Sequence, residues 1–165
     1  AQKECGSLPF VHPGLNNALD FKSYDYELFD YGNLQLGIAK DGEPCFEFPA
    51  GTPDSGQRIF AFYYWIFPNL MFNFYPWGLS FNQVEPQGID QTLVRFRTYH
   101  REGTDFDWTV NQIHQTEMED EAVVESVQLG IQSPYYKAGR YSPSMEKGVH
   151  HFHQLVAKFL NEAEV

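Results

Sequence analysis

A long apolar stretch broken by turn residues constrains the fold of this chain more than any other feature. Residues 58–86 read RIFAFYYWIFPNLMFNFYPWGLSFNQVEP, and the run is interrupted at Pro68-Asn69 and at Pro76-Trp77-Gly78. Aromatic enrichment and breakers at this spacing favour β-strands over a buried helix. The stretch therefore predicts two or three strands.

The segments on either side of this stretch also alternate. In residues 24–40, apolar side chains keep one parity on each side of Gly32-Asn33, which predicts a β-hairpin or two strand segments. Residues 40–57, rich in Gly and Pro, predict a loop. Residues 91–102 predict a further strand after a polar turn, with Val94 and Phe96 toward the core and the arginines toward solvent. Together these segments predict an antiparallel sheet of about five to seven strands.

The apolar period becomes helical near Asp105. Apolar residues then recur at spacings of three and four, which predicts a helix from about 107 to 131. After a loop at 134–143, Ser144 can cap a last helix over Met145–Asn161. Its expected inward side chains are Val149, Phe152, Leu155, Val156, Phe159 and Leu160. The predicted fold class is α+β, as a single domain over residues 1–165.

Composition excludes several classes of partner and setting. The 165 residues suffice for one domain with a real core, and 15 Phe and 10 Tyr need a core, a cavity or an interface to cover them. A net charge of -11 argues against nucleic acid and anionic membranes as partners. No apolar run is long enough to span a membrane, and the first residues lack a signal-peptide pattern. Cys5 and Cys45 form neither a disulfide framework nor a C-x-x-C site, so we expect a reduced, cytoplasmic setting.

Spacing alone does not identify a reaction. A solvated acidic helix face is the simplest interpretation of the acids Glu117, Glu119, Asp120, Glu121 and Glu125. His150 and His153 can share a helical face, but only Glu146 could add a ligand nearby, which favours a structural role for this histidine cluster. Nucleotide-binding and hydrolase motifs are absent from the sequence.

Three segments in a fixed order carry a family resemblance that extends over nearly the whole chain. FYYWIFPNLMFNFYPWGLSFNQVEP, MEDEAVVESVQLGIQSPYYKAGRYSP and GVHHFHQLVAKFL resemble the catalytic domain of Rieske-type non-haem iron oxygenases. The nearest branch contains choline, carnitine and glycine-betaine monooxygenase-like enzymes, beside the aromatic ring-hydroxylating dioxygenase α subunits. The resemblance implies a helix-grip, START-like fold, in which a curved antiparallel sheet wraps around a long C-terminal helix and a substrate cavity lies between them.

The resemblance also implies a mononuclear Fe(II) site. In this family two histidines and one aspartate hold the iron and leave positions open for O₂. Asp120 matches the aspartate, because Glu119-Asp120 followed by Glu125 fits the family pattern E-D-x-x-x-x-E.

The other expected ligands fall near the start of the chain. Residues 4–13, ECGSLPFVHP, resemble the family segment E-C-Y-H-C-P-F-V-H-P. His12 matches the second histidine and Glu4 the acid that links the iron to the Rieske cluster of a neighbouring subunit. Ser7, a poor Fe(II) ligand, stands at the position of the first histidine.

A second departure concerns the family's [2Fe-2S] cluster, whose C-x-H and C-x-x-H ligand pairs do not occur in this sequence. We therefore expect this polypeptide alone to be inactive as an oxygenase. The resemblance implies a small-molecule substrate, electrons from NAD(P)H through a reductase or ferredoxin, and assembly as a homotrimer.

Three functional hypotheses follow. In the first, the domain is an oxygenase domain whose pocket is lined by the aromatic residues Phe72, Phe74, Tyr75 and Trp77. Such a wall suits an aromatic ring or, through cation–π attraction, a quaternary ammonium group, and the resemblance favours the latter. In the second, a non-catalytic helix-grip module binds an apolar or aromatic ligand and its stabilisation by ligand is indifferent to chelators. In the third, exposed aromatics form a trimer face and the role is assembly.

Overall fold

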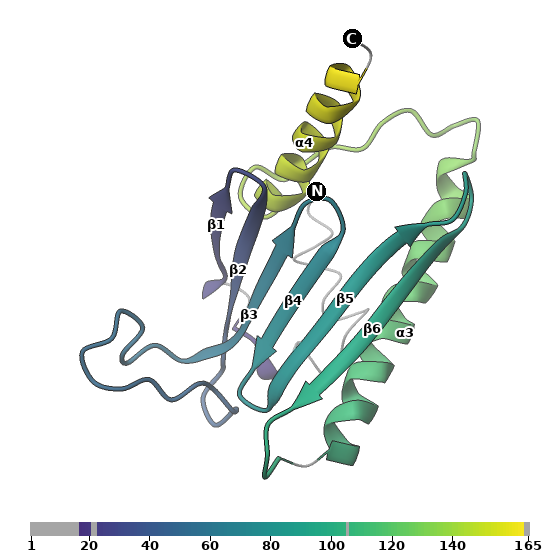
Figure 1. Ribbon diagram of the computed structural model, residues 1–165. Coiled ribbons are helices and arrows are strands. Elements are labelled where there is room, and N and C mark those ends of the chain that lie inside the picture. Colours follow the sequence, from purple (N-terminus) through teal and green to yellow (C-terminus); the bar gives the residue numbers. More distant parts are fainter. Residues whose placement is uncertain (1–16, 21–22, 105, 164–165) are drawn as a thin grey trace.

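The computed structural model describes residues 17–20, 23–104 and 106–163, and its elements form a sheet followed by two helices (Figure 1). The elements are β1 (Asp25–Phe29), β2 (Gly32–Ile38), β3 (Ile59–Ile66), β4 (Leu70–Tyr75), β5 (Gly78–Pro86), β6 (Thr92–His100), α3 (Phe106–Ile131) and α4 (Lys147–Ala163). The predicted α+β class is confirmed. No helix in these ranges is long and apolar enough to cross a membrane.

The sheet is an antiparallel meander in which each strand pairs with the next one along the chain, in the order β1-β2-β3-β4-β5-β6. Both predicted breaks lie in turns: Pro68-Asn69 separates β3 from β4, and Pro76-Trp77 separates β4 from β5. The apolar stretch therefore forms three strands, the upper end of the predicted range.

The first hairpin turns earlier than the sequence indicates. Asp30 and Tyr31 form the turn, whereas Gly32 and Asn33 are the first residues of β2. Gly32 is needed for close approach, because a Cβ there would lie 2.5 Å from the backbone oxygen of Trp65. Gly32 therefore serves the close packing of β2 against β3, and the turn itself lies just before it.

The sheet has two distinct faces, since residues directly opposite one another in neighbouring strands project to the same side. Tyr63 lies opposite Asn73, and Asn73 lies opposite Ser80. We call the face that bears these three residues the inner face. Helix α4 packs over its β1–β2 end, where the Phe152 and Trp65 rings meet edge to face at 5.1 Å.

The opposite, outer face is partly covered by the loop over residues 40–57. Phe46 and Phe48 from this loop pack edge-on against Phe62 of β3, at ring-centroid distances of 5.3 and 6.3 Å. Arg58 holds the loop by donating to the carbonyl oxygen of Lys40 at 2.7 Å. Apolar packing and the hydrogen bond from Arg58 thus hold this predicted loop against the sheet.

The expected burial of Val94 and Phe96 in β6 is wrong, and apolar residues of α3 are exposed as well. Val94 and Phe96 are 38% and 46% exposed, and Val124 and Val127 of α3 are 66% and 55% exposed. The parity in β6 is as predicted, because Phe96 lies opposite Asn82 on the inner face. However, β6 is an edge strand, and α3 runs beside it without covering it among the described residues (Figure 1).

Helix α4 differs from its prediction in its start and in part of its apolar face. It begins at Lys147, and the preceding turn is closed by Ser142 and Glu146, whose backbone N–H donates to the carbonyl oxygen of Ser142 at 2.9 Å. Ser144 is therefore not the cap. Leu155 is buried as expected, but Leu160 is 64% exposed because the helix extends beyond the sheet.

Ile59 provides a measure of packing in the core, since its side chain is fully buried at 0% exposure. We expect Ile59→Val to lower the free energy of unfolding by about 1 kcal/mol, because one buried methylene is lost and the site relaxes only in part. Ile89, which is 105% exposed, provides the matched control. Ile89→Val should change the free energy by less than about 0.5 kcal/mol. Urea unfolding measures both values, and equal losses would contradict this packing.

Candidate functional site

A row of aromatic side chains extends across the inner face. Tyr24 stacks on Tyr63 at 6.4 Å between ring centroids, and Tyr63 meets Tyr75 edge to face at 5.9 Å. Tyr75 stacks on Trp77 at 4.8 Å, and Trp77 stacks on His100 at 5.2 Å. The row arises because β3 and β4 place alternate residues on this face and the β4–β5 turn adds Trp77. It offers several π faces on one side of the sheet.

The tyrosines in this row are held in their neutral form. Burial, followed by the neighbouring Tyr75 and Tyr24, raises the pKa of Tyr63 well above its ordinary value. Burial likewise raises the pKa of Tyr75 and of Tyr24. The buried Tyr63 hydroxyl interacts with the side chains of Tyr75 and Tyr24. These phenols can therefore donate a hydrogen bond to a ligand but cannot act as bases.

Glu117 is the residue through which α3 contributes to this site. Burial raises the pKa of the Glu117 carboxyl to about 8, and the nearby Asp120 adds to the increase. Glu117 in turn contributes to the raised pKa of Tyr75, after burial, so helix and aromatic row are electrostatically coupled. Residues three apart on a helix lie on one side, which accounts for the proximity of Glu117 to Asp120. Asp120 itself is exposed.

The aromatic residues predicted from the sequence do not form a single wall. Tyr75 and Trp77 belong to the inner row described above. Phe72 and Phe74 have the opposite parity and lie on the outer face, where Phe72 contacts Phe81 at 5.0 Å and Phe74 contacts Tyr64 at 6.0 Å. Two expected pocket residues are therefore separated from the other two by the sheet.

Sequence reasoning did not single out Tyr63 and placed Glu117 on a solvated acidic helix face, whereas Glu117 is partly buried. Tyr63 could have been found from its strand parity once the β3–β4 turn was fixed at Pro68-Asn69. Glu117 could have been found from its place one turn before Asp120. Glu4, Ser7 and His12 lie outside the described residues.

The described residues alone do not fit a three-ligand iron site. No group of three or more His, Cys, Asp or Glu side chains converges within residues 17–20, 23–104 and 106–163. Asp120 offers one carboxylate, and Glu117 beside it is better suited to holding a proton. At least one ligand of a three-ligand iron site on Asp120 would therefore have to come from outside these ranges.

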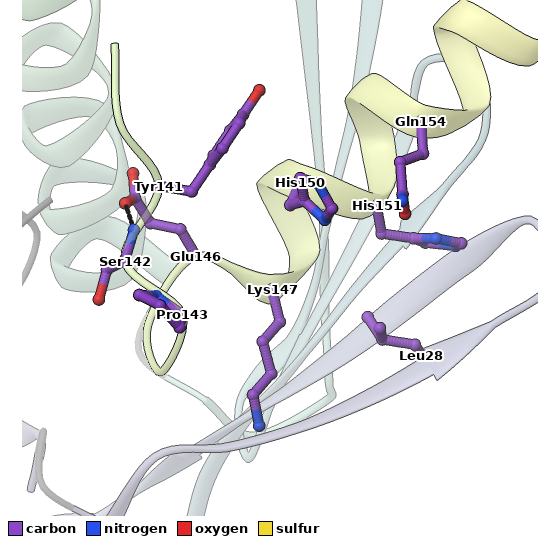
Figure 2. A pocket seen from close by; sticks show the side chains of 9 residues that line it. All are labelled: Leu28, Tyr141, Ser142, Pro143, Glu146, Lys147, His150, His151 and Gln154. Atoms are coloured by element: carbon purple, nitrogen blue, oxygen red, sulfur yellow. Dashed lines mark hydrogen bonds between the residues drawn. The ribbon is translucent and has the colours of Figure 1, made fainter.

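A separate open groove of about 410 Å³ lies where α4 begins (Figure 2). It is lined by Leu28, Tyr141, Ser142, Pro143, Glu146, Lys147, His150, His151 and Gln154. The histidines here have partners within the protein. A His151 ring nitrogen lies 2.8 Å from the carbonyl oxygen of Phe29, the Tyr141 hydroxyl is hydrogen-bonded to His153, and His150 meets the Tyr141 ring edge to face at 5.1 Å. These contacts favour the structural role expected for the cluster.

The raised pKa of Glu117 predicts a pH dependence of stability. Between about pH 4.5 and pH 8 the folded state retains a proton that the unfolded state has released. Stability from this group is therefore greatest at low pH and decreases as the pH rises through this window. We expect Glu117→Gln to remove about 1 to 3 kcal/mol of the difference between pH 5 and pH 8.5.

Denaturant unfolding of iron-free protein at the two pH values measures this difference. The control is Glu121→Gln, which changes an exposed acid on the same helix and should leave the difference unchanged. Equal behaviour of the Glu117→Gln variant and the unmodified protein would show that Glu117 is not desolvated by the fold.

Comparison with known proteins links this fold to one family. The family model for the ring hydroxylating alpha subunit (catalytic domain) matches residues 8–162. Choline monooxygenase from Arabidopsis thaliana is 32% identical over 157 residues, which cover 90% of this chain and 35% of that protein. The Beta vulgaris choline monooxygenase is 29% identical over 153 residues, 88% of this chain and 32% of that protein. The chain thus spans about a third of the length of these relatives.

Among solved structures, the quaternary ammonium Rieske monooxygenase CntA, in complex with an inhibitor, has the same fold. The superposition has a TM-score of 0.75 at 23% identity and covers 94% of this chain and 43% of CntA. The expected curved antiparallel sheet with a C-terminal helix is thereby confirmed.

Proposed function

This chain belongs to the family of ring-hydroxylating α-subunit catalytic domains, and we propose that it is the oxygen-inserting domain of a Rieske-type oxygenase acting on a small organic substrate. The match of the family model to residues 8–162 is the observation that carries this proposal. The position of Glu117, which is coupled both to Asp120 and to Tyr75 of the aromatic row, supports it. The domain extends over residues 1–165 in this proposal.

We further propose that Asp120 and His12 hold a mononuclear Fe(II). Carboxylate and imidazole are the ligand types that non-haem iron oxygenases use, and the metal, when bound, supplies the chemistry of O₂ activation. Ser7 at the other expected ligand position predicts weak iron affinity. Glu4 would face the electron-donating cluster of a neighbouring subunit.

The proposed substrate is a quaternary ammonium compound, with an aromatic compound as the alternative. Tyr75 and Trp77 offer stacked π faces, to which a cation without hydrogen-bond donors is attracted. Glu117, which couples to Tyr75, holds its proton at pH 7 when no ligand is bound, and a bound cation would favour its ionised form. The names of the choline monooxygenase relatives and of CntA agree with the same substrate class.

In this proposal the residues of the site bind and orient the substrate. Tyr75 and Trp77 hold the cationic group, and the neutral Tyr63 hydroxyl donates a hydrogen bond. Electrons come from NAD(P)H through a reductase or ferredoxin and a [2Fe-2S] cluster carried outside this sequence. Assembly as a homotrimer and a reduced, cytoplasmic setting remain predictions.

Metal analysis of the longest natural form of the protein, called full-length below, tests the proposal. We expect about three iron atoms per chain, two from a Rieske cluster and one mononuclear. A chelator should remove the mononuclear iron first and lower the melting temperature. Cluster iron alone, with no chelator-sensitive metal, would contradict the proposal and favour a non-catalytic binding module.

A further inference from the structure

The two faces of the sheet carry different kinds of aromatic ring. At the centre of the outer face the rings are mostly phenylalanine, namely Phe62, Phe72, Phe74 and Phe81. On the inner face of β3 and β4 they are Tyr63, Trp65 and Tyr75. Packing alone would be served equally well by phenylalanine, because a buried phenol hydroxyl costs free energy unless it has a partner. Tyrosine and tryptophan differ from phenylalanine chemically in that they lose an electron far more readily.

The oxidisable rings of the inner face follow one another without a gap. Trp77 lies 4.8 Å from Tyr75 between ring centroids, Tyr75 lies 5.9 Å from Tyr63, and Tyr63 lies 6.4 Å from Tyr24. Tyr24 in turn lies 5.9 Å from Tyr26 in β1. Electron transfer between rings at such separations is fast, because electronic coupling is strongest between neighbouring rings. The row therefore connects the β4–β5 turn with the start of β1 through residues that can each be oxidised.

The hydroxyls of the three central tyrosines also interact. The Tyr63 hydroxyl interacts with those of Tyr75 and Tyr24, so it links the two halves of the row. Burial raises the pKa of each of these phenols, and none of them loses its proton to form a phenolate in the resting protein. An electron and a proton must therefore leave such a phenol together. Between neighbouring phenols this is a hydrogen-atom transfer, in which one O–H bond breaks, another forms and no separate base is needed.

We propose that the row from Trp77 to Tyr24 is a radical-transfer chain that carries one oxidising equivalent across the inner face. An oxygen-centred radical takes the indole hydrogen atom of Trp77 and becomes a hydroxyl compound. The Trp77 radical then gains an electron and a proton as Tyr75 loses both. Tyr75 regains a hydrogen atom from Tyr63, and Tyr63 regains one from Tyr24. A thiol ends the sequence by giving its hydrogen atom to the Tyr24 radical.

The inference goes beyond the proposed function and rests on it only for the source of the oxidant, which is O₂ reduced without oxidation of the substrate. The chain then directs damage away from the inner face. Its contacts do not depend on the identity of the substrate.

Pulse radiolysis of the full-length protein tests the inference with the azide radical, a one-electron oxidant that prefers tryptophan. We expect part of the tryptophan radical absorbance to convert into tyrosyl absorbance at a rate independent of protein concentration. The part that disappears in the Trp77→Phe variant belongs to Trp77, and Tyr75→Phe should abolish the same part. Trp65→Phe is the control, because Trp65 meets the rings of Phe67 and Phe152 edge to face and these cannot pass the radical on. Conversion from Trp77 that survives Tyr75→Phe would overturn the chain.

A nitroso spin trap, followed by peptide mass spectrometry, locates the end of the transfer. In the unmodified protein we expect trapped adduct on Tyr24, and in the Tyr63→Phe variant loss of that adduct with accumulation on Tyr75. Conversion from Trp77 should persist in this variant, which shows that its fold is intact. Tyr64→Phe is the matched control, because Tyr64 is the next residue in β3 and contacts Phe74 on the outer face. Equal yields of Tyr24 adduct in the Tyr63→Phe and Tyr64→Phe variants would overturn the role of Tyr63.

The outcome is separable from that of the proposed function, because azide radicals replace any oxidant made by the protein. Loss of the chain's signals from protein that holds chelator-sensitive iron would overturn this inference alone. Transfer along the row in protein without that iron would overturn the proposed function alone.

Discussion

Replacing Asp120 with alanine in the full-length protein should remove the mononuclear iron and lower the rate of substrate oxidation by roughly 1,000-fold or more, about 4 kcal/mol in the barrier. Asp120 is the carboxylate that we propose as a ligand, and the expected imidazole ligand, His12, cannot replace its charge. The exposed position of Asp120 means that the substitution leaves no buried cavity. Folding should therefore be preserved while metal binding is lost.

Iron content and activity are measured on the same preparations. Glu121→Ala is the control, since Glu121 is the adjacent exposed acid on α3 and is not proposed as a ligand. The Asp120→Ala variant should retain the absorbance of the [2Fe-2S] cluster while losing one iron per chain. Full iron content and activity in that variant would show that the aspartate assigned from the family pattern is the wrong residue.

Gly78→Ala should destabilise the fold by about 3 kcal/mol, the largest effect expected for adding a methyl group at any glycine in the described part of the chain. Gly78 opens β5 with a φ of 155°, which side-chain-bearing residues rarely adopt. A Cβ at this position would lie 2.1 Å from the backbone oxygen of Tyr99 in β6. Because the clash is with backbone, it can be relieved only by separating β5 from β6.

Gly88→Ala is the matched control, because Gly88 lies in the next turn and a methyl group added there would have no other atom within 4 Å. It should change the free energy of unfolding by less than about 0.5 kcal/mol. Urea unfolding of both variants gives the comparison. Tryptophan fluorescence, used to follow this unfolding, would also report any displacement of Trp77, which stacks on Tyr75 next to Gly78. A Gly78→Ala variant as stable as the Gly88→Ala variant would contradict the close strand approach.

The regular elements could be predicted because their local signals are strong. The breakers at Pro68-Asn69 and Pro76-Trp77 delimit three strands, and a sustained period of three to four gives α3 to within a residue at each end. The first hairpin was displaced because Gly32 serves the close approach of Trp65, a contact between distant residues. Secondary-structure propensity depends on the local sequence and carries no information about such contacts.

Burial was less predictable than secondary structure. Alternation in β6 gives the correct parity of Phe96 but not whether another element covers that side chain. The aromatic wall was misjudged for a related reason: Phe74 and Tyr75 are adjacent in a strand, and adjacent residues project to opposite faces. The spacing of the acids alone predicted that Asp120 lies on a solvated helix face. Only the family pattern E-D-x-x-x-x-E identified it as a candidate iron ligand.

The most direct test of this account is oxygen incorporation from ¹⁸O₂ by the full-length, iron-loaded protein, supplied with NAD(P)H and a reductase. In a monooxygenation, one labelled atom enters the substrate, the other leaves as water, and NAD(P)H supplies two electrons. We predict labelled product from a quaternary ammonium compound, the proposed substrate class, quenched before exchange with solvent, and none from the Asp120→Ala variant. Unlabelled substrate recovered from fully iron-loaded protein, across quaternary ammonium and aromatic compounds, would contradict the assignment of this domain to oxygen insertion.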